Sequence, residues 1–528
     1  MKRLSGLALA GLLIIAAAGC MTSRVVTLQH EIDQDRTGLR MYSRPGEHVA
    51  GYTDARGYYH EFDGFVRALP GDSMELCASA PAGSLSEPGL GWRIAMPRDS
   101  VRTIFVKQVN APLTVLAVIG TTVAVAGVAI AVALATKESC PFIYSWDGKQ
   151  YVFDGEPYGG ATIRALERTD WSELEHLTAS RGQYRLMLTN EVDETQHTNR
   201  IVLQVVDHPA GTTVVMDREG GAHAFRRLAP LTAARDENGR DLLTWLQRND
   251  HAAWYPDLRA YAREDSVTDT RNHITLEFAR PPGVTRAFLV SNAATGQWGS
   301  HMIRSMLGMR GDRVQEFYAA VNGSALVRRQ LLDWNRREEL FELTFEVRRG
   351  EEWVRQDFIP GGGPFISESR AIPVDLAGVT GDRVRIRIHP PIGFWSLNSF
   401  HLAWESADAS VTEVLPEMGS GAGGANVVEA LRATDSLALD FPNRGDRTEL
   451  TFTAPPPRPG MERTVFAETR GWYEVHLHDL AAPDVAALER LTYEPGYVVR
   501  RALREFTEYE RTGVLQGVAT VPAQAGGR

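Results

Sequence analysis

Alternation of apolar and polar residues predicts β-strands through most of this chain. Residues 341–347 and 384–388 alternate one by one, and Arg385 and Arg387 fall on the polar side of the second run. Successive side chains of a strand point to opposite faces, so this pattern indicates antiparallel sheets with one buried and one solvated face. Further strand-like runs cover residues 184–188, 200–206, 212–216, 274–278, 287–290, 450–452 and 472–478.

Apolar residues at helical spacing predict helices at fewer places. One short helix is expected at 241–249, one at 298–321 with a break near the turn 310–312, and one at 498–509. Shorter strand-like runs fill residues 25–109. The expected fold class is therefore mainly β with some α: a small N-terminal β domain, one apolar helix, and then β-sandwich-like or jelly-roll-like modules.

Changes in pattern divide the 528 residues into six predicted segments. In chain order these are a signal peptide, a small β-rich domain, an apolar helix, a β-rich module with helices, a β-sandwich-like module, and a C-terminal region of strands, a helix and a loose tail. Their predicted bounds are 1–19, 20–111, 112–136, 137–325, 326–415 and 416–528.

The pair Asp147-Gly148 predicts a tight β-hairpin, because a two-residue turn favours residues that tolerate positive φ. Folding about this pair would place Tyr144 opposite Tyr151 and Phe142 opposite Phe153. Aromatic pairs across two strands stabilise a sheet, so we expect the hairpin to form.

The first twenty residues predict export. A basic start is followed by an apolar run and by Ala17-Ala18-Gly19-Cys20. This order is typical of a secretory signal, and the cysteine after small residues is similar to a bacterial lipobox. We expect Cys20 to carry a lipid. Plain secretion and an uncleaved anchor stay open as alternatives.

A second apolar segment complicates the predicted location. Residues 113–135 carry no charge and would form a helix of about 35 Å, against a bilayer core of roughly 30 Å. Small residues share one face and would let another helix approach closely; these are Gly120, Ala124, Gly127 and Ala131. We expect a membrane helix that can also support an oligomer. The alternative is an apolar helix packed within the protein.

The net charge of −10 argues against nucleic-acid binding, which needs clustered Lys and Arg. The three cysteines include Cys77 and Cys140, which could form a disulfide if both lie outside the cytoplasm. We expect the large C-terminal region to lie there, as a periplasmic or extracellular body.

A metal site is one candidate for chemistry. Alternation along 472–478 places Glu474, His476 and His478 on one strand face, and these residue types can bind a divalent metal. A solvated strand face explains the same pattern. Apart from this metal and the lipid on Cys20, the sequence predicts no cofactor.

The other candidate residues for catalysis or binding are supported by weaker sequence patterns. The acidic residues Asp147, Asp154 and Glu156 could do acid–base work, but the two aspartates precede glycines and suit turns. The pairs 300–301 and 207–208 lack the surroundings of a catalytic serine. Trp395, in a predicted loop, could be an exposed platform for a sugar ring or a core residue.

The stretch 140–156 resembles a block found in uncharacterised bacterial envelope proteins, of the form C-P-x-x-Y-S-W-D-G-x-x-Y-x-F-D-G-E. Similar blocks occur in exported proteins that also carry tetratricopeptide or β-propeller repeats, which this sequence lacks. The resemblance covers about residues 140–480. It implies export and β-rich modules, and it brings no activity.

These patterns together favour a membrane-anchored lipoprotein of the bacterial envelope that acts as a non-catalytic binding or scaffold protein, with envelope proteins or glycans as partners. The rival interpretation is a polysaccharide-active or metal-dependent enzyme on a β scaffold.

Overall fold

The computed structural model describes eight strands between residues 22 and 108. From residue 141 to residue 512 it describes everything except 250–252, 263–268, 364–365, 436 and 479–480. Cys20, Cys140 and the predicted apolar helix 112–136 lie outside the described residues. Among the residues described, no helix combines the length and apolar character needed to cross a bilayer.

The described strands divide between two compact units. The first holds an antiparallel sheet in the order β1-β8-β4-β5-β3-β2, with β6 beside β5 and β7 beside β6. Buried Val66, Met74, Val101 and Ile104 form part of its core. The bounds of the strands are β1 Thr22–Thr27, β2 Asp33–Gln34, β3 Arg40–Met41, β4 Val49–Asp54, β5 Tyr59–Leu69, β6 Ser73–Ala78, β7 Arg93–Pro97 and β8 Val101–Gln108.

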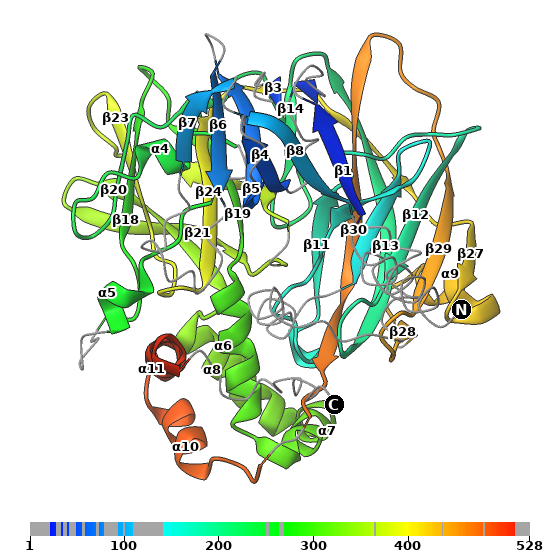
Figure 1. Cartoon of the computed structure of the whole chain (residues 1–528), viewed down its shortest axis with the longest axis vertical. Coiled ribbons are helices and arrows are strands. Elements are labelled where there is room, and N and C mark those ends of the chain that lie inside the picture. The colour runs from blue at the N-terminus through cyan, green and yellow to red at the C-terminus, as the bar shows by residue number, and fades with distance from the viewer. Residues whose placement is uncertain are drawn as a thin grey trace, which may run out of the picture. The chain divides into compact units, whose positions relative to one another are not determined.

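The second unit begins with a β-sandwich (Figure 1). One sheet contains β10 (Tyr151–Gly155), β9 (Phe142–Trp146), β12 (Gln183–Thr189), β29 (Arg447–Thr453) and β27 (Met418–Gly421). The other contains β11 (Arg168–Glu173), β30 (Met461–Val475), β13 (Glu194–Pro209) and β26 (Ser410–Val414), with β28 (Leu439–Phe441) also beside β13. Alternate residues of both sheets, such as Leu186, Leu203 and Phe452, meet in one buried core.

Residues 210–409, between β13 and β26, leave this sandwich and build three further sheets; this segment is called the insert. The first is β14 (Thr213–Met216), β15 (Ala222–Phe225) and β25 (Ser406–Ala407). The second is β16 (Ala229–Pro230), β24 (Trp395–Ala403), β19 (Arg286–Thr295) and β22 (Glu368–Asp375). The third is β17 (Ala233–Arg235), β18 (Ile274–Ala279), β23 (Arg383–Ile388), β20 (Glu342–Arg349) and β21 (Glu352–Pro360).

The third sheet of this insert shows the alternation that the sequence predicts. Ile386 and Ile388 are fully buried, whereas Arg385 and Arg387 point outward and pair with Glu277 and Glu346 of neighbouring strands. The fold is thus mainly β with several antiparallel sheets, as expected.

The pairing of strands crosses the predicted module boundaries at 325 and 415. Strand β13 pairs with β26, β28 and β30, so the sandwich is assembled from both sides of the insert. Sequence patterns report where strands lie and carry no direct signal for such long-range partners.

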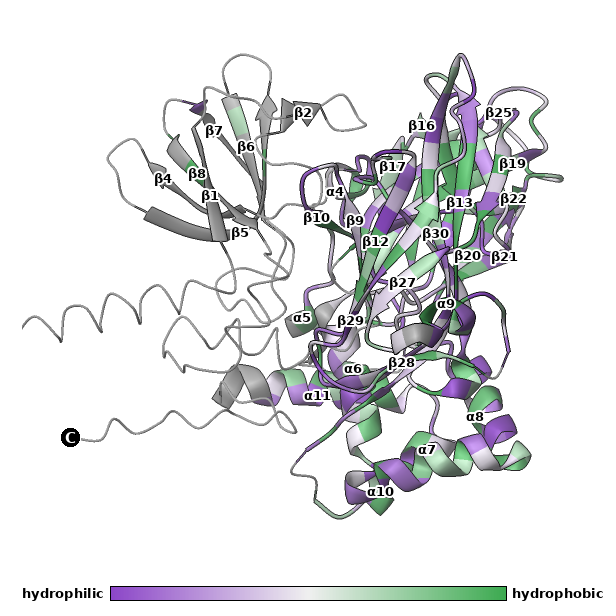
Figure 2. Ribbon diagram, turned by 90° about the vertical axis from the view of Figure 1, so that its right-hand side faces the viewer, coloured by the Kyte–Doolittle hydropathy of each residue, from purple (hydrophilic) through white to green (hydrophobic). Residues whose placement is uncertain are grey.

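Helices α5, α6, α7, α8, α10 and α11 gather at one end of the second unit, below most of its sheets in both views, whereas α4 and α9 lie beside strands (Figure 1, Figure 2). The predicted helix 298–321 is confirmed as two helices broken at 309–313, and the C-terminal helix is also present. Helix α8 was not expected. The bounds are α4 Leu243–Leu246, α5 Leu258–Ala262, α6 Gln297–Gly308, α7 Val314–Gly323, α8 Ala325–Glu338, α9 Val427–Ala430, α10 Val485–Tyr493 and α11 Tyr497–Thr512.

The predicted hairpin exists, but its register was wrong by two residues. Tyr151 pairs with Trp146 and Phe153 with Tyr144, because four residues rather than two form the turn. The Asp147 carboxylate accepts hydrogen bonds from the backbone N–H groups of Lys149 and Gln150, at 2.7 and 2.8 Å, and this stabilises the longer turn. The shift by an even number leaves the side chains of residues 151–153 on their predicted faces, and a bulge after Phe153 changes the register beyond them.

Trp395 is not an exposed platform. It lies in β24, is 2% exposed and contacts the ring of Phe394. The loop in which it was predicted is a short turn that ends at Phe394, so Trp395 is the first residue of the strand and lies in the core.

Candidate functional site

A cavity of about 450 Å³ opens where the end of α8 and the start of α11 meet two loops of the insert. Its lining combines charged side chains of both signs with a few apolar ones. The lining residues are Asp269, Thr270, Arg271, Arg337, Glu338, Leu340, Pro391, Pro495, Gly496, Val498, Val499 and Arg500.

Arg271 is fixed in the wall of this cavity by backbone carbonyls. Its guanidinium donates to His389 O at 2.6 Å and to the O atoms of Glu338 and Glu339, both at 2.8 Å. The two glutamates end α8, where unpaired carbonyls and the helix dipole favour a cation. Burial lowers the pKa of Arg271, and the nearby Glu339 carboxylate opposes that effect.

Glu338 joins α8 to the first residues of α11. Its carboxylate accepts from the backbone N–H of Gly496 at 2.7 Å and from Arg337 Nε at 2.8 Å. Arg337 also donates to Thr492 O at 2.9 Å. The charged groups on this side of the cavity are therefore held in place before any ligand arrives.

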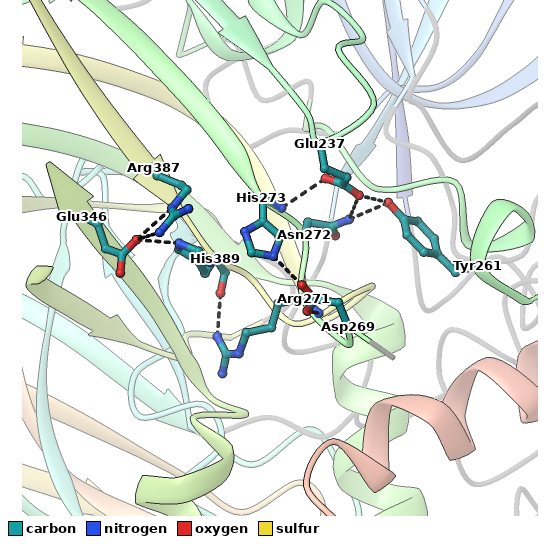
Figure 3. Close-up of polar contacts among 9 residues, drawn as sticks. All are labelled: Glu237, Tyr261, Asp269, Arg271, Asn272, His273, Glu346, Arg387 and His389. Carbon is teal, nitrogen blue, oxygen red and sulfur yellow. Dashed lines mark hydrogen bonds and ion pairs between the residues drawn. The ribbon is translucent and has the colours of Figure 1, made fainter. Parts of the chain in front are cut away.

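Asp269 and His273 form a carboxylate–imidazole pair beside the cavity (Figure 3). His273 Nε2 lies 2.6 Å from Asp269 Oδ2, and the other carboxylate oxygen accepts from the backbone N–H of Arg271 at 3.0 Å. Burial would raise the pKa of Asp269, but the hydrogen bonds from His273 and from the Arg271 N–H, together with the charge of the nearby imidazoles, outweigh it, so the pKa lies below its usual value. His273 keeps 35% of its side chain exposed, so solvent and a ligand can reach it.

A second carboxylate–imidazole pair, Glu346 and His389, packs against the first. The rings of His273 and His389 meet edge to face at 4.6 Å, and His389 Nε2 lies 2.8 Å from Glu346 Oε2. Arg387 donates two hydrogen bonds to the same oxygen, at 2.9 and 2.6 Å. Burial lowers the pKa of His389, although Glu346 opposes the effect.

Strand register explains why these residues meet. Ile274 of β18 pairs with Ile388 of β23, so the preceding His273 lies next to the following His389. Glu346 of β20 pairs with Arg387 of β23. Three strands from distant parts of the sequence therefore bring the two imidazoles and their carboxylates together.

Glu237 extends the network on the far side of His273 (Figure 3). It accepts hydrogen bonds from Tyr261 Oη, from Asn272 Nδ2 at 3.0 Å and from the backbone N–H of His273 at 3.1 Å. Burial would raise the pKa of Glu237, but these donors lower it. Burial and the Glu237 carboxylate together raise the pKa of Tyr261 well above its usual value, so the phenol remains a donor.

This arrangement offers two kinds of chemistry. Arginine, aspartate and glutamate side chains can bind hydroxyl groups by paired hydrogen bonds. A carboxylate-oriented imidazole can also transfer a proton. Thr270 is the hydroxyl side chain in the lining, and the lining contains no cysteine or serine.

The residues predicted for a metal site are placed differently from the prediction. Strand β30 ends at Val475, so His476 and His478 follow it in a loop. Both rings contact Asp193: His476 Nδ1 lies 2.9 Å from Oδ1 and His478 Nε2 lies 2.5 Å from Oδ2. Within the part of the chain that the structure describes, no group of three or more His, Cys, Asp or Glu side chains could hold a metal ion.

The other predicted residues have structural partners. Asp154 is buried and contacts the backbone N–H and the ring of His176. His301 is buried and lies 2.9 Å from Glu505. Of the two cysteines of the possible disulfide, Cys77 lies in β6; with Cys140 outside the described residues, that disulfide stays a prediction.

Sequence reasoning missed the pair Asp269–His273 and the carboxylate Glu237. The spacing of Asp269, Arg271 and His273 just before a predicted strand is a signal that could have been noticed. Nothing in that local pattern points to His389 or Glu346, which are more than 70 residues away along the chain.

Comparisons with known proteins add little. No protein-family model and no curated protein matches the chain. Among solved structures, it aligns with a β-porphyranase of glycoside hydrolase family 86 from the human gut bacterium Bacteroides plebeius, at 7% identity and a TM-score of 0.14. The alignment covers 50% of this chain and 40% of that one. A likeness of this size carries no argument, so the cavity is interpreted from its own residues.

Proposed function

We propose that this chain is a non-catalytic binding protein of the bacterial envelope, tethered to a membrane by a lipid on Cys20, and that its cavity binds a small hydroxyl-rich molecule such as a saccharide unit. The observation that carries the proposal is the cavity lining. Planar charged side chains of both signs surround it, and internal hydrogen bonds already hold them.

The size of the cavity supports this proposal. About 450 Å³ falls in the range of roughly 300–1,000 Å³ that is usual for small-molecule sites. Leu340, Pro391 and Val498 supply apolar surface for the carbon skeleton of a ligand, while the charged groups face its hydroxyls.

The charge of the lining limits the ligand class. Three arginines and two acidic residues, Asp269 and Glu338, leave a formal charge of 3 − 2 = +1. A neutral sugar or one with a single carboxylate suits this balance, and a polycation does not.

The side chains that line the cavity are already ordered, and this is the physical reason to expect that the cavity binds a ligand. Ordering a long side chain on binding costs about 0.5–1.5 kcal/mol. Backbone carbonyls already order Arg271 and Arg337, so most of the entropy cost of ordering them is included in folding and does not weaken binding.

Ligand binding is tested with the full chain in detergent, screened against an array of neutral and acidic oligosaccharides. We expect binding of at least one class, and a loss of roughly tenfold in affinity when Asp269→Asn removes one charge-assisted hydrogen bond. Asp440→Asn is the matched control, because Asp440 also pairs with a histidine, His197, and does not line the cavity. Absence of binding to every oligosaccharide contradicts the proposal.

The lipid anchor is tested separately. Growth of the native host with labelled palmitate should label the mature protein, and Cys20→Ser should abolish the label. An unlabelled native protein contradicts the anchor and leaves the cavity proposal standing.

A second function is favoured by one observation: Asp269 orients an accessible imidazole at the edge of the cavity. An enzyme acting on polysaccharide could use His273 as a proton donor or acceptor. Release of reducing sugar from an envelope polysaccharide, lost in His273→Gln and kept in His197→Gln, would favour this enzyme over the binding protein.

A further inference from the structure

Helix α8 is unusual because its charged and apolar residues are not used to fill a core. None of its fourteen residues is buried, in a helix that the structure describes throughout. Val327, Leu331 and Trp334 recur at helical spacing and are half-buried, and Trp334 donates to Leu491 O of α10 at 2.9 Å. These residues mark the side of α8 that faces the rest of the protein.

The opposite side of α8 is basic. Residues at i, i+3, i+4, i+7 and i+11 share one helix face. Here that face consists of Ala325, Arg328, Arg329, Leu332 and Arg336, and all five are exposed. We call this set the arginine face. Arg336 is 76% exposed and Leu332 is 36% exposed.

The charge of the arginine face is largely uncompensated. Arg328 donates to a neutral backbone carbonyl, Asn322 O, at 2.8 Å. Arg336 pairs with Asp333 at 3.0 Å, but Asp333 is itself 57% exposed, so solvent screens the pair. Across α8, four arginines stand against two acidic residues, which gives 4 − 2 = +2 in a chain whose net charge is −10.

Apolar side chains accompany this charge. Leu326 at the start of α8 is 66% exposed, and on the neighbouring α10 Val485 and Tyr493 are 72% and 78% exposed. Figure 2 shows α7, α8 and α10 together at the end of the unit away from its sheets. On α8 itself, arginines and exposed leucines on one helix are typical of a surface that rests on lipid headgroups.

We propose that the arginine face of α8 docks on the anionic headgroup surface of a lipid bilayer. Charge complementarity supports this partner, because each basic residue near such a surface contributes attraction that salt weakens. A second copy of the chain is a poorer fit, since two arginine faces would repel each other. The contact is independent of the cavity and adds an electrostatic hold to any lipid on Cys20.

The experiment measures vesicle binding by the full chain carrying Cys20→Ser, so that no lipid anchor contributes. Vesicles of phosphatidylcholine are compared with vesicles that also contain phosphatidylglycerol. Only the difference between them is used, because an apolar segment can enter either kind. The native surface should prefer the anionic vesicles, and added salt should reduce that preference.

The test variant changes Arg328, Arg329 and Arg336 to glutamine, which removes charge and keeps helix propensity. At about 1 kcal/mol for each basic residue, we expect a loss on the order of a hundredfold in affinity for anionic vesicles at low salt. The matched control changes three exposed arginines elsewhere, Arg226, Arg227 and Arg432, to glutamine. It has the same net charge and should bind like the native protein.

Three results would overturn the proposal. The first is equal binding of the native protein to both vesicle types, and the second is an equal loss of affinity in the test and control variants. The third is sedimentation of the native protein as a dimer and of the test variant as a monomer. The last result would assign the face to a second copy. Asp269→Asn should leave vesicle binding unchanged, so failure of the cavity proposal and failure of this one are distinguishable.

Discussion

Single residues in the insert show how one carboxylate can hold several partners. The Glu346 carboxylate accepts hydrogen bonds from Nε and Nη2 of Arg387 and contacts His389. Its side chain is 22% exposed. Burial would raise the pKa of Glu346, but these hydrogen bonds outweigh it and lower the pKa. Removing one member of this partly buried network would leave its partners without hydrogen bonds, which is costly.

Glu346→Gln should therefore lower the free energy of unfolding at neutral pH by about 1–3 kcal/mol, as measured by urea denaturation. Glu351→Gln is the control, because Glu351 also pairs with an arginine, Arg348, but is 93% exposed; it should change stability by less than about 1 kcal/mol. Equal effects of the two changes would contradict the role of the network.

The same shifts predict how stability depends on pH. A lowered carboxylate pKa contributes stability that is present above the usual value of 4.5 and is lost as pH falls through the folded pKa of Glu346. The lowered pKa of His389 acts in the same direction below 6.5, because the unfolded chain takes up its proton first. The cost of Glu346→Gln, measured by urea unfolding, should therefore shrink as pH falls below 4.5 and through the folded pKa of Glu346. A cost that stays constant to pH 3 would contradict this assignment.

Substitution of Trp395 distinguishes a buried core residue from an exposed sugar-binding platform. Because it is 2% exposed, Trp395→Ala should destabilise the chain by about 3–5 kcal/mol. Trp395→Phe keeps most of the buried ring and should cost much less. An exposed sugar platform would lose ligand binding in both variants and keep its melting temperature, so thermal melting decides between the two interpretations.

Elements of structure meet through close backbone contacts that the sequence does not reveal. A loop at 158–160, after β10, packs on a loop at 361–363, after β21. A Cβ atom on Gly159 would lie 2.1 Å from Gly362 O, and Arg168 donates to the carbonyls of Gly159 and Gly361. The sandwich and the insert are thus joined by glycines that allow two backbones to touch.

Gly159→Ala should consequently cost about 1–3 kcal/mol or more, since a backbone atom cannot move aside as a side chain can. Gly308→Ala is the control: a Cβ there meets nothing within 4 Å, at the end of α6. It should be neutral or slightly stabilising in the same urea titration. A cost for Gly308→Ala as large as that for Gly159→Ala would contradict the contact.

At the scale of elements, local sequence patterns located individual strands and helices, but they did not predict which strands pair. Alternation located the strands around 341–347 and 384–388, and helical spacing located α6, α7 and α11. Helix α8 was missed because exposed Leu326 and Leu332 obscure the stripe of Val327, Leu331 and Trp334. Its start does carry a capping signal, since Ser324 accepts from the backbone N–H of Val327 at 3.4 Å. The site depends on the register of β18, β23 and β20, and no local pattern fixes that register.

The whole second unit depends on strands from both sides of the insert. A chain that ends at residue 409 lacks β26 to β30 and would expose the core around Leu186 and Leu203. We expect this truncated chain to aggregate or to be digested quickly by protease under conditions in which the full chain is stable. A truncated chain that melts like the native protein would contradict the discontinuous sandwich.

This topology also sets an order of events during synthesis. When β13 leaves the ribosome at residue 209, the strands that flank it in the finished sheet are still unmade, and β26 begins only at residue 410. The early half of the sandwich must wait for the entire insert to be translated, with its apolar face uncovered. Chaperones that bind exposed apolar segments would therefore have a long time to act on the nascent chain before the sandwich closes.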